Sequence, residues 1–538
     1  MTSPEAENQL PLVGIEVPSQ DGQEPSPAEP RPLPRLKPIN RQQMILRTVM
    51  VEDLLEPDHP ARALWELVEG LDLSLFYKDI KAVEGAPGQD AYDPHLLICL
   101  WIYAYSEGVS AAREVARCSE YHPAYQWLTG MKSVNYHSLS TFRVQYKEAL
   151  DKLFAQVLAV MQSQGLVELQ RVTQDGTKIQ AAASRRSLHR EKTLQKHLEE
   201  AQQRVKELEE QAQQEDRGQN ARQRAAQERA AREKLERMQA ALEQLAQVQK
   251  EQAGQTRPEE CRGSESEAEA RKMKHSDGSF SPSYNAQLVA DAKADLIVAV
   301  QLTQACNDQG LLEAGLDEVQ RVCQQTPQEA LVDDGYVSRA TVVETQKRNV
   351  ELIGTGQLDQ QHDPGKTARN CERRGVAPAF YPQEFRYDAE HDLYVCPAGQ
   401  PLPHRGVKDD RPGVERHQYR AKASTCRGCA LQAQCCPPSG KSGKFTHGRL
   451  IVRSQNEPVV DAYVEKMKTP EAQAIYQQRK RLAEFPNLWI KEKLGLRRFR
   501  VRGLVKAGCE LLWACLAYNL QQWIRLRWRP ALVNQAAA

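Results

Sequence analysis

The chain has 538 residues, of which 40% are hydrophobic and 27% charged, and this length suggests about three or four domains. Its formal net charge of +1 excludes the class of uniformly basic nucleic-acid-binding proteins. The charge is uneven, however, because residues 476–529 hold 13 Lys and Arg against three Glu. Such a local basic field can hold DNA in a neutral chain, although a solvated basic face is the simpler interpretation of this segment alone.

No segment has the pattern of a signal peptide or a membrane span. The start of the chain is polar and rich in proline, and the longest apolar stretch, Leu511–Ile524, is too short to cross a bilayer. The 13 cysteines of a large chain of this kind favour reduced thiols and metal ligands over a disulfide framework. We therefore expect a cytoplasmic protein without a membrane partner.

The N-terminal part divides into a tail and a helical domain. Residues 1–36 combine low hydrophobicity with many prolines, which predicts a disordered tail. Residues 37–165 have helical periodicity, and Asp93 followed by Pro94 matches a helix N-cap with proline at the first helical position. We expect an all-α N-terminal domain.

A strand-like segment at Val167–Ile179 is followed by a long charged stretch. Residues 185–252 are nearly free of glycine, and their apolar residues recur at helical spacing in two separate runs. This pattern predicts a helical-hairpin insertion.

Strands and helices alternate further along, which predicts an α/β sheet. The predicted strands are Tyr284–Asp291, Leu296–Thr303, Ala330–Val332 and Val350–Ile353, and the predicted helices are Asp308–Cys323 and Ser338–Arg348. Residues 355–454 are rich in loops and cysteines, and the chain is helical again from Thr469 to Arg529.

Three acidic residues stand out by their positions. Asp175 and Asp333 each close a predicted strand just before a glycine-containing turn, and Glu484 lies on a late helix, seven residues before Lys491. Each one alone is ordinary, since Asp before Gly is common turn chemistry and a helical Glu is often a solvated charge. Their order and their placement on these elements favour a functional set.

These segments resemble the DDE transposases of bacterial insertion sequences. In that family the first Asp commonly stands in Asp-Gly-Thr, the second in Asp-x-Gly-Tyr, and the Glu in Tyr-x2-Arg-x3-Glu-x6-Lys. Asp175 and Asp333 match the first two patterns, and Glu484 with its following lysine matches the end of the third. Four residues instead of three separate Arg479 from Glu484, and Lys480 restores the spacing at the cost of the arginine.

The resemblance covers most of the chain from Arg41 to Leu526. Its further landmarks are Pro57-Asp58-His59, Tyr92-Asp93-Pro94, Tyr103-x-Tyr105, Tyr284-Asn285-x-Gln287-x3-Asp291, Asn307-Asp308, Arg502-Gly503 and Ala517-Tyr518-Asn519-Leu520. It implies a ribonuclease-H-like mixed-sheet core formed by residues 166–354 and 455–530, interrupted by the hairpin at residues 185–252. It also implies that the N-terminal domain, residues 37–165, binds the DNA ends.

The implied activity is metal-dependent DNA strand cleavage and strand transfer at the ends of an insertion sequence. Two divalent cations can stabilise the charge that develops on the attacking and leaving oxygens, and carboxylates are suitable ligands for Mg²⁺ or Mn²⁺. Asp175 would bridge the cations, while Asp333 and Glu484 would complete their coordination.

The implied partner is double-stranded DNA, both the inverted-repeat ends and the target, bound by a homodimer. The residues expected to contact DNA phosphates are Tyr476, Arg479, Lys480, Lys491 and Arg502. Two alternatives remain, a ribonuclease-H-like nuclease and a DNA-binding protein that has lost catalysis. The intact Asp175, Asp333 and Glu484 argue against the second.

The cysteine-rich insertion, residues 355–454, is the candidate zinc site. A Cys-x2-Cys turn at Cys426 and Cys429 is the usual half of a four-thiolate site, and Cys435 and Cys396 supply the other two sulfurs. The resembling family carries a similar four-cysteine insertion at this place. His404 is an alternative to Cys396. Reduced cysteines in a loop are the competing interpretation, which we disfavour because so many thiols in an unstructured loop would be a liability.

Overall fold

The computed structural model describes the greater part of the chain. The described residues are 42, 44, 48–83, 90–214, 221–252, 256–356, 358, 364–411, 414–437, 447–454 and 457–537. The tail predicted at residues 1–36 lies outside them. The chain divides into two units, residues 1–49 and residues 50–538, and everything that follows concerns the second.

The N-terminal part of this unit is helical, as predicted. Its elements are a 3₁₀ turn at Val51–Leu54 and the helices α1 (Pro60–Glu69), α2 (Ser74–Tyr77), α3 (Pro94–Ser106), α4 (Ala112–Tyr121), α5 (Pro123–Thr129), α6 (Tyr136–Gln145) and α7 (Lys147–Ser163). Three of these helices begin with a capping side chain followed by proline. In α3 the Asp93 carboxylate accepts a hydrogen bond from the His95 backbone N–H at 2.9 Å, which confirms the predicted cap.

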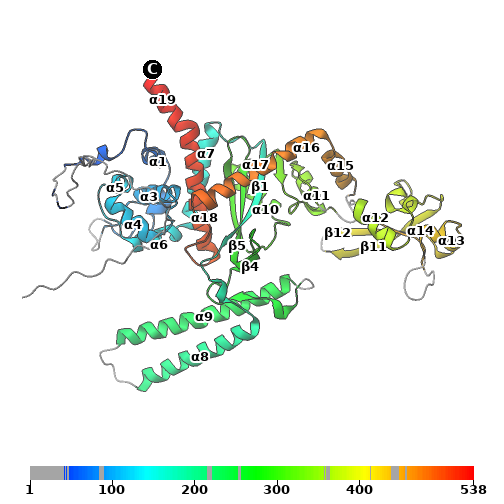
Figure 1. Ribbon diagram of the computed structural model, residues 1–538, viewed down its shortest axis with the longest axis horizontal. Helices are drawn as coiled ribbons and strands as arrows, with labels where there is room; N and C mark the ends of the chain where they lie inside the picture. The colour runs from blue at the N-terminus through cyan, green and yellow to red at the C-terminus, as the bar shows by residue number, and fades with distance from the viewer. Residues whose placement is uncertain are drawn as a thin grey trace, which may run out of the picture. The chain divides into compact units, whose positions relative to one another are not determined.

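Two helices whose side chains are mostly buried lie in the core (Figure 1). They are α3 and α18 (Leu504–Trp523), and α18 packs against α3, α7 and a strand of the sheet. The Trp513 indole donates to the Arg143 carbonyl at 3.0 Å, and the Asn519 amide pairs with both backbone groups of Ile297. One continuous hydrophobic cluster therefore includes the N-terminal helices and the sheet.

The central sheet is mixed, as predicted. Its strands are β1 (Arg171–Gln180), β4 (Arg271–Lys274), β5 (Phe280–Asp291), β6 (Leu296–Thr303), β7 (Glu329–Val332) and β8 (Glu351–Ile353). Their order is β4-β5-β1-β7-β8, and β6 also pairs with β5. The strands β1, β7 and β8 are parallel, while β5 is antiparallel to β1 and β6 is antiparallel to β5. The helices α10 (Leu312–Cys323) and α11 (Arg339–Lys347) precede β7 and β8.

The prediction that Asp175 closes the first strand is wrong. The strand β1 continues to Gln180, one residue past the predicted strand-like segment, because its antiparallel pairing with β5 extends past the aspartate. The parallel pairing of β1 with β7 does stop beside Asp175, at Gln174 and Val332. Asp175 thus lies where the parallel half of the sheet ends, which is a property of the pairing and cannot be read from the strand's own sequence.

Residues 185–252 contain the predicted pair of antiparallel helices, α8 (Glu191–Gln214) and α9 (Ala221–Glu251), which lie side by side in Figure 1. Near the start of α8, Leu194 packs against Ala241 and Leu245 of α9 in a small cluster of their own. Farther along α8, Glu209 forms an ion pair with Arg232 at 3.2 Å. Two short strands at the base, β2 (Leu188–His189) and β3 (Gly263–Ser264), pair with each other.

The cysteine-rich insertion is more ordered than the expected loop. It contains a five-stranded antiparallel sheet in the order β13-β12-β11-β10-β9, with its own buried cluster. Its strands and helices are α12 (Pro364–Arg373), β9 (Arg386–Asp388), β10 (Leu393–Val395), β11 (Pro401–Arg411), β12 (Val414–Arg420), α13 (Ala423–Arg427), α14 (Gln432–Cys435) and β13 (Leu450–Ser454). The sequence concealed these strands because they are short or carry many charged residues and so show no clear alternation.

The chain after the insertion is helical. The elements are α15 (Glu457–Met467), α16 (Pro470–Gln477), α17 (Arg479–Leu488), a π-helical turn at Trp489–Lys493, α18, a second π-helical turn at Ile524–Trp528 and α19 (Arg529–Ala537). Pro486 lies inside α17 without ending it, and the helix passes directly into the first π turn. No helix in the described part of the chain has the length and apolarity that a bilayer crossing requires.

Candidate active site

Asp175 and Asp333 lie on neighbouring parallel strands at the same edge of the sheet. The last residues that pair between the two strands are Gln174 of β1 and Val332 of β7. Each aspartate is the residue that directly follows. Neighbouring strands of a sheet are about 4.8 Å apart, and the register therefore places the two aspartate backbones side by side. Sequence spacing alone did not give this register.

Asp175 is one of the carboxylates whose pKa is raised by burial. Desolvation raises its pKa to about 6, although the Asn487 amide, the Gly176 N–H and Arg479 oppose the shift. Asn487 Nδ2 donates to one carboxylate oxygen at 2.9 Å, and the Gly176 N–H donates to the other at 2.9 Å. A buried carboxyl group with a raised pKa is a common feature of functional sites because a metal or a second charge offsets its desolvation.

A third aspartate, Asp308, lies at the same edge. Its Oδ1 accepts hydrogen bonds from Asn285 Nδ2 at 2.8 Å and Gln287 Nε2 at 2.7 Å, and its charge contributes to the raised pKa of Asp175. A Cβ at Gly176 would come within 2.3 Å of the same oxygen, so the glycine makes room for Asp308. Asn307-Asp308 is one of the landmarks of the family resemblance, but the sequence pattern indicates no role for Asp308.

The helix α17 contacts both predicted aspartates. Arg479, at its start, forms an ion pair with Asp333 at 3.6 Å, and Asn487, near its end, donates to Asp175. Glu484 lies between these two residues, one turn before Asn487, and its side chain is exposed. Among the described residues, the oxygens of Asp175, Asp333 and Glu484 do not all approach within 4.8 Å of one another.

The residues predicted to contact DNA have different surroundings. Lys491, on the π turn, is half-buried, and its pKa is lowered by desolvation while the charge of Asp175 opposes that shift. Tyr476 accepts a hydrogen bond from Thr355 Oγ1 at 2.8 Å, and Arg479 lies over its ring, 6.0 Å from the centroid. Lys480 and Arg502 are exposed. At this edge Arg479 thus pairs with Asp333, and the charge of Asp175 acts on Lys491.

Glu510, a second acidic residue of the basic C-terminal segment, has a structural role. It is completely buried in α18, lies 3.6 Å from Arg143 of α6, and accepts the Arg500 backbone N–H at 2.8 Å. Arg143 also packs over the Trp101 ring. This buried pair joins the N-terminal helices to the C-terminal core and leaves neither group accessible to a substrate.

The raised pKa of Asp175 predicts a stability effect. Because the folded-state pKa of about 6 exceeds the ordinary value of 3.8, protonated Asp175 stabilises the fold below about pH 4, and this contribution is lost as the pH rises through 6. Without divalent cation at pH 8, Asp175→Asn should therefore raise the free energy of unfolding by about 1–3 kcal/mol, a gain that disappears near pH 4. Thermal melting at the two pH values measures it. The matched control is Asp334→Asn, which changes an exposed neighbour, and lower stability of Asp175→Asn at pH 8 would contradict the prediction.

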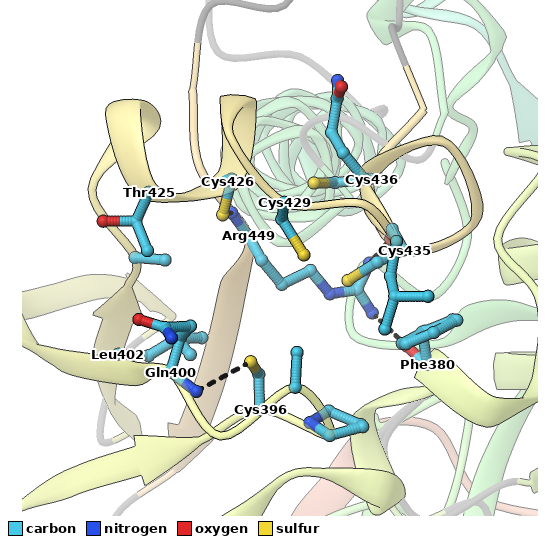
Figure 2. Close-up of a pocket in the computed structure, with 15 residues that line it drawn as sticks. Phe380, Cys396, Gln400, Leu402, Thr425, Cys426, Cys429, Cys435, Cys436 and Arg449 are labelled. Carbon is cyan, nitrogen blue, oxygen red and sulfur yellow. Dashed lines mark hydrogen bonds between the residues drawn. The ribbon is translucent and has the colours of Figure 1, made fainter.

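The four predicted zinc ligands line one pocket of the cysteine-rich insertion (Figure 2). Cys396 follows β10, Cys426 lies on α13, Cys429 follows it, and Cys435 ends α14. The Gln400 N–H donates to the Cys396 sulfur at 3.3 Å. The Arg449 N–H donates to the Cys426 sulfur at 3.5 Å. Backbone donors of this kind stabilise thiolates, which is the form that binds metal.

The cysteine sulfurs of this pocket affect one another's pKa values. Burial raises the pKa of Cys435, the charges of Cys426 and Cys396 raise it further, and Arg449 lowers it. Among the described residues, no three of these sulfurs lie within 4.8 Å of one another, so the cluster is open. His404 does not line the pocket, and its ring lies against that of His417 with a 3.2 Å separation between nitrogens. The donor set thus fits four thiolates better than three thiolates and His404.

Comparisons with known proteins match two parts of the chain. A family model described as a transposase DDE domain matches residues 395–524, and a model described as a transposase domain (DUF772) matches residues 49–145. The first match includes Glu484 and the four cysteines, while Asp175 and Asp333 lie outside both. No curated protein and no solved structure matches the chain.

Proposed function

Since the chain belongs to the DDE transposases of insertion sequences, we propose that it cuts DNA strands at the ends of such an element and joins them to a target. The observation that carries the proposal is the arrangement of Asp175, Asp333 and α17. Each aspartate directly follows the last residue that pairs between the neighbouring parallel strands β1 and β7, and the helix that bears Glu484 contacts both aspartates. In the sheet, β5, β1, β7 and β8 are consecutive neighbours, and β1 is parallel to β7. This strand order supports a ribonuclease-H-like core.

Divalent cations fit the residues at this edge. Asp175 and Asp333 supply hard oxygen ligands, Glu484 supplies a third, and Asp308 adds a fourth carboxylate close to Asp175. Asn487 Oδ1 is buried and, among the described residues, has no hydrogen-bond partner, so it offers an acceptor for a metal-bound water. Two Mg²⁺ or Mn²⁺ ions would stabilise the negative charge on the attacking and leaving oxygens.

The chain's own residues prepare the site for these ions. At neutral pH Asp175 loses its proton because its pKa is about 6. A bound cation would stabilise the buried negative charge more than the hydrogen bond from Asn487 does by itself. Arg479 would leave Asp333 and bind phosphate, since a guanidinium pairs with either anion in the same bidentate manner. Tyr476, Lys480, Lys491 and Arg502 would hold the DNA backbone near the cut.

Zinc is the proposed structural metal of the insertion. Cys396, Cys426, Cys429 and Cys435 line one pocket with backbone donors to two of the sulfurs, and the positive charge of Arg449 favours the thiolate of Cys435. Their closure around one ion would stabilise a small sheet with few buried residues. Reduced thiols of this kind favour a cytoplasmic location.

The proposal is tested by incubating full-length protein with labelled DNA of the element's own ends and Mg²⁺ or Mn²⁺. We expect nicks at the element boundary and, with target DNA added, joined products; because two ends are processed together, the active species is at least a dimer on DNA. Cutting without joining would indicate a nuclease, and end binding without cutting would indicate a DNA-binding protein that has lost catalysis.

A further inference from the structure

Three possible metal ligands meet at the base of the helical hairpin, away from the carboxylates and the cysteines. They are His189 on β2, His197 on α8 and Glu265 directly after β3, and their ligand atoms all lie within 4.8 Å of one another. Glu265 Oε2 lies 2.9 Å from His197 Nδ1 and 3.6 Å from His189 Nε2. In the described part of the chain, no other group of three His, Cys, Asp or Glu residues gathers so closely.

The backbone around these ligands is fixed by several contacts. The Glu265 N–H donates to the Ser187 carbonyl at 3.0 Å, and the hydroxyls of Ser187 and Ser264 lie 2.9 Å apart in the interior. A Cβ at Gly263 would come within 3.1 Å of the Ala241 carbonyl, so β3 packs closely on α9. The ligands therefore lie on, or directly beside, paired strands and a helix, which hold a metal site more accurately than loops do.

One hydrogen bond accounts for only part of the cluster, because it joins Glu265 to His197 and does not include His189. A simple His–Glu pair uses one imidazole, but here one carboxylate oxygen faces nitrogens of two imidazoles, and the second, at 3.6 Å, is beyond hydrogen-bond range. Ligands that share a tetrahedral ion with bonds of about 2.0–2.1 Å are about 3.3 Å apart, between the two observed separations. All three side chains are half-buried, with exposures of 25–33%, so an ion can enter from solvent.

We propose that His189, His197 and Glu265 bind one transition-metal ion of the Zn²⁺ class. Two imidazoles and one carboxylate are a donor set that suits zinc, and a water molecule takes the remaining tetrahedral position. Because His189 follows β1 along the chain and His197 belongs to α8, the ion ties the start of the hairpin to the strands at its base. This site is independent of the four cysteines and of the proposed cutting activity.

The experiment compares the zinc content of full-length protein variants after chelation, reloading with Zn²⁺ and desalting at pH 7.5. Wild type and the control Glu259→Gln, which changes an exposed residue of the same segment, should each hold one more zinc per chain than Glu265→Gln and His197→Gln. Zinc affinity at this site should fall more than about 100-fold in those two variants.

Cobalt provides a second measurement that distinguishes the two proposed zinc sites. Thiolate-to-cobalt charge-transfer bands report the cysteines alone, so Glu265→Gln should keep these bands and lose one equivalent of cobalt. Glu265→Gln preserves side-chain size and a hydrogen bond, and circular dichroism checks its fold, which keeps the test valid if His197→Gln does not fold. Equal metal content in Glu265→Gln and Glu259→Gln would overturn the proposal, whether or not the cysteines bind zinc.

Discussion

The variant Glu484→Gln should lose DNA strand cutting by on the order of 10²–10³-fold or more while binding the element's ends with nearly unchanged affinity. The amide keeps the size of the side chain but removes the charge that completes the coordination of a cation. That charge matters most in the transition state, where the cations stabilise developing oxyanions. DNA affinity depends instead on Lys and Arg contacts to phosphate, so the loss of one carboxylate should leave it intact. Cleavage of labelled ends in Mg²⁺ and a binding assay at the same salt concentration measure the two effects.

The matched control for this variant is Glu492→Gln. Glu492 is eight residues farther along the chain on the π turn, half exposed, and forms an ion pair with the exposed Arg497. Its neutralisation should change cutting by less than about twofold, because exposed ion pairs contribute little. If Glu484→Gln cut at the wild-type rate and Glu492→Gln did not, the catalytic glutamate would be wrongly assigned. Glu510 is excluded as a substitute, since it is buried against Arg143.

The variant Cys429→Ser should lose the zinc of the cysteine-rich insertion and loosen its sheet without unfolding the rest of the protein. Removing one of four thiolates opens the tetrahedral site, and the insertion has only five fully buried residues in the cluster beneath it. Limited proteolysis should show faster cleavage within residues 386–454, and metal analysis should show one zinc fewer per chain.

The control for the cysteine variant is Cys436→Ser. Cys436 lines the same pocket but lies outside the predicted ligand set, and burial together with the neighbouring Cys435 and Cys426 raises its pKa to about 12. Its replacement should leave the zinc content and the protease pattern unchanged. Loss of zinc in Cys436→Ser together with retention in Cys429→Ser would show that the ligand set is wrong.

The sequence was informative where local patterns decide structure. The Asp93–Pro94 cap started a helix as predicted, and the alternating strands and helices of residues 284–353 formed the predicted mixed sheet. The sequence was uninformative about contacts between segments that are far apart along the chain. Asp308 approaches Asp175 through Asn285 and Gln287, and nothing in its own neighbourhood indicates that contact.

The helix around Glu484 shows a further limit of sequence patterns. Pro486 predicts a kink or restart because it lacks a backbone N–H. The helix α17 does not restart at Pro486 but continues to Leu488, and a π turn follows it. Asn487 of the helix donates to Asp175, and the charge of Asp175 acts on Lys491 of the turn. A π turn depends on the packing of the whole helix, and such turns often occur at functional sites. Neither the role of Asn487 nor the turn has a distinctive sequence signal.

The most direct test of the central claim is a crystal structure of the protein bound to its end DNA in Mn²⁺, with anomalous scattering used to locate the ions. We expect two Mn²⁺ peaks about 3.5–4 Å apart, coordinated by Asp175, Asp333 and Glu484. We also expect Arg479 to move from Asp333 to a DNA phosphate. Mn²⁺ peaks at other residues, or a Glu484 carboxylate more than about 10 Å from both aspartates, would contradict a two-metal site built from these three side chains.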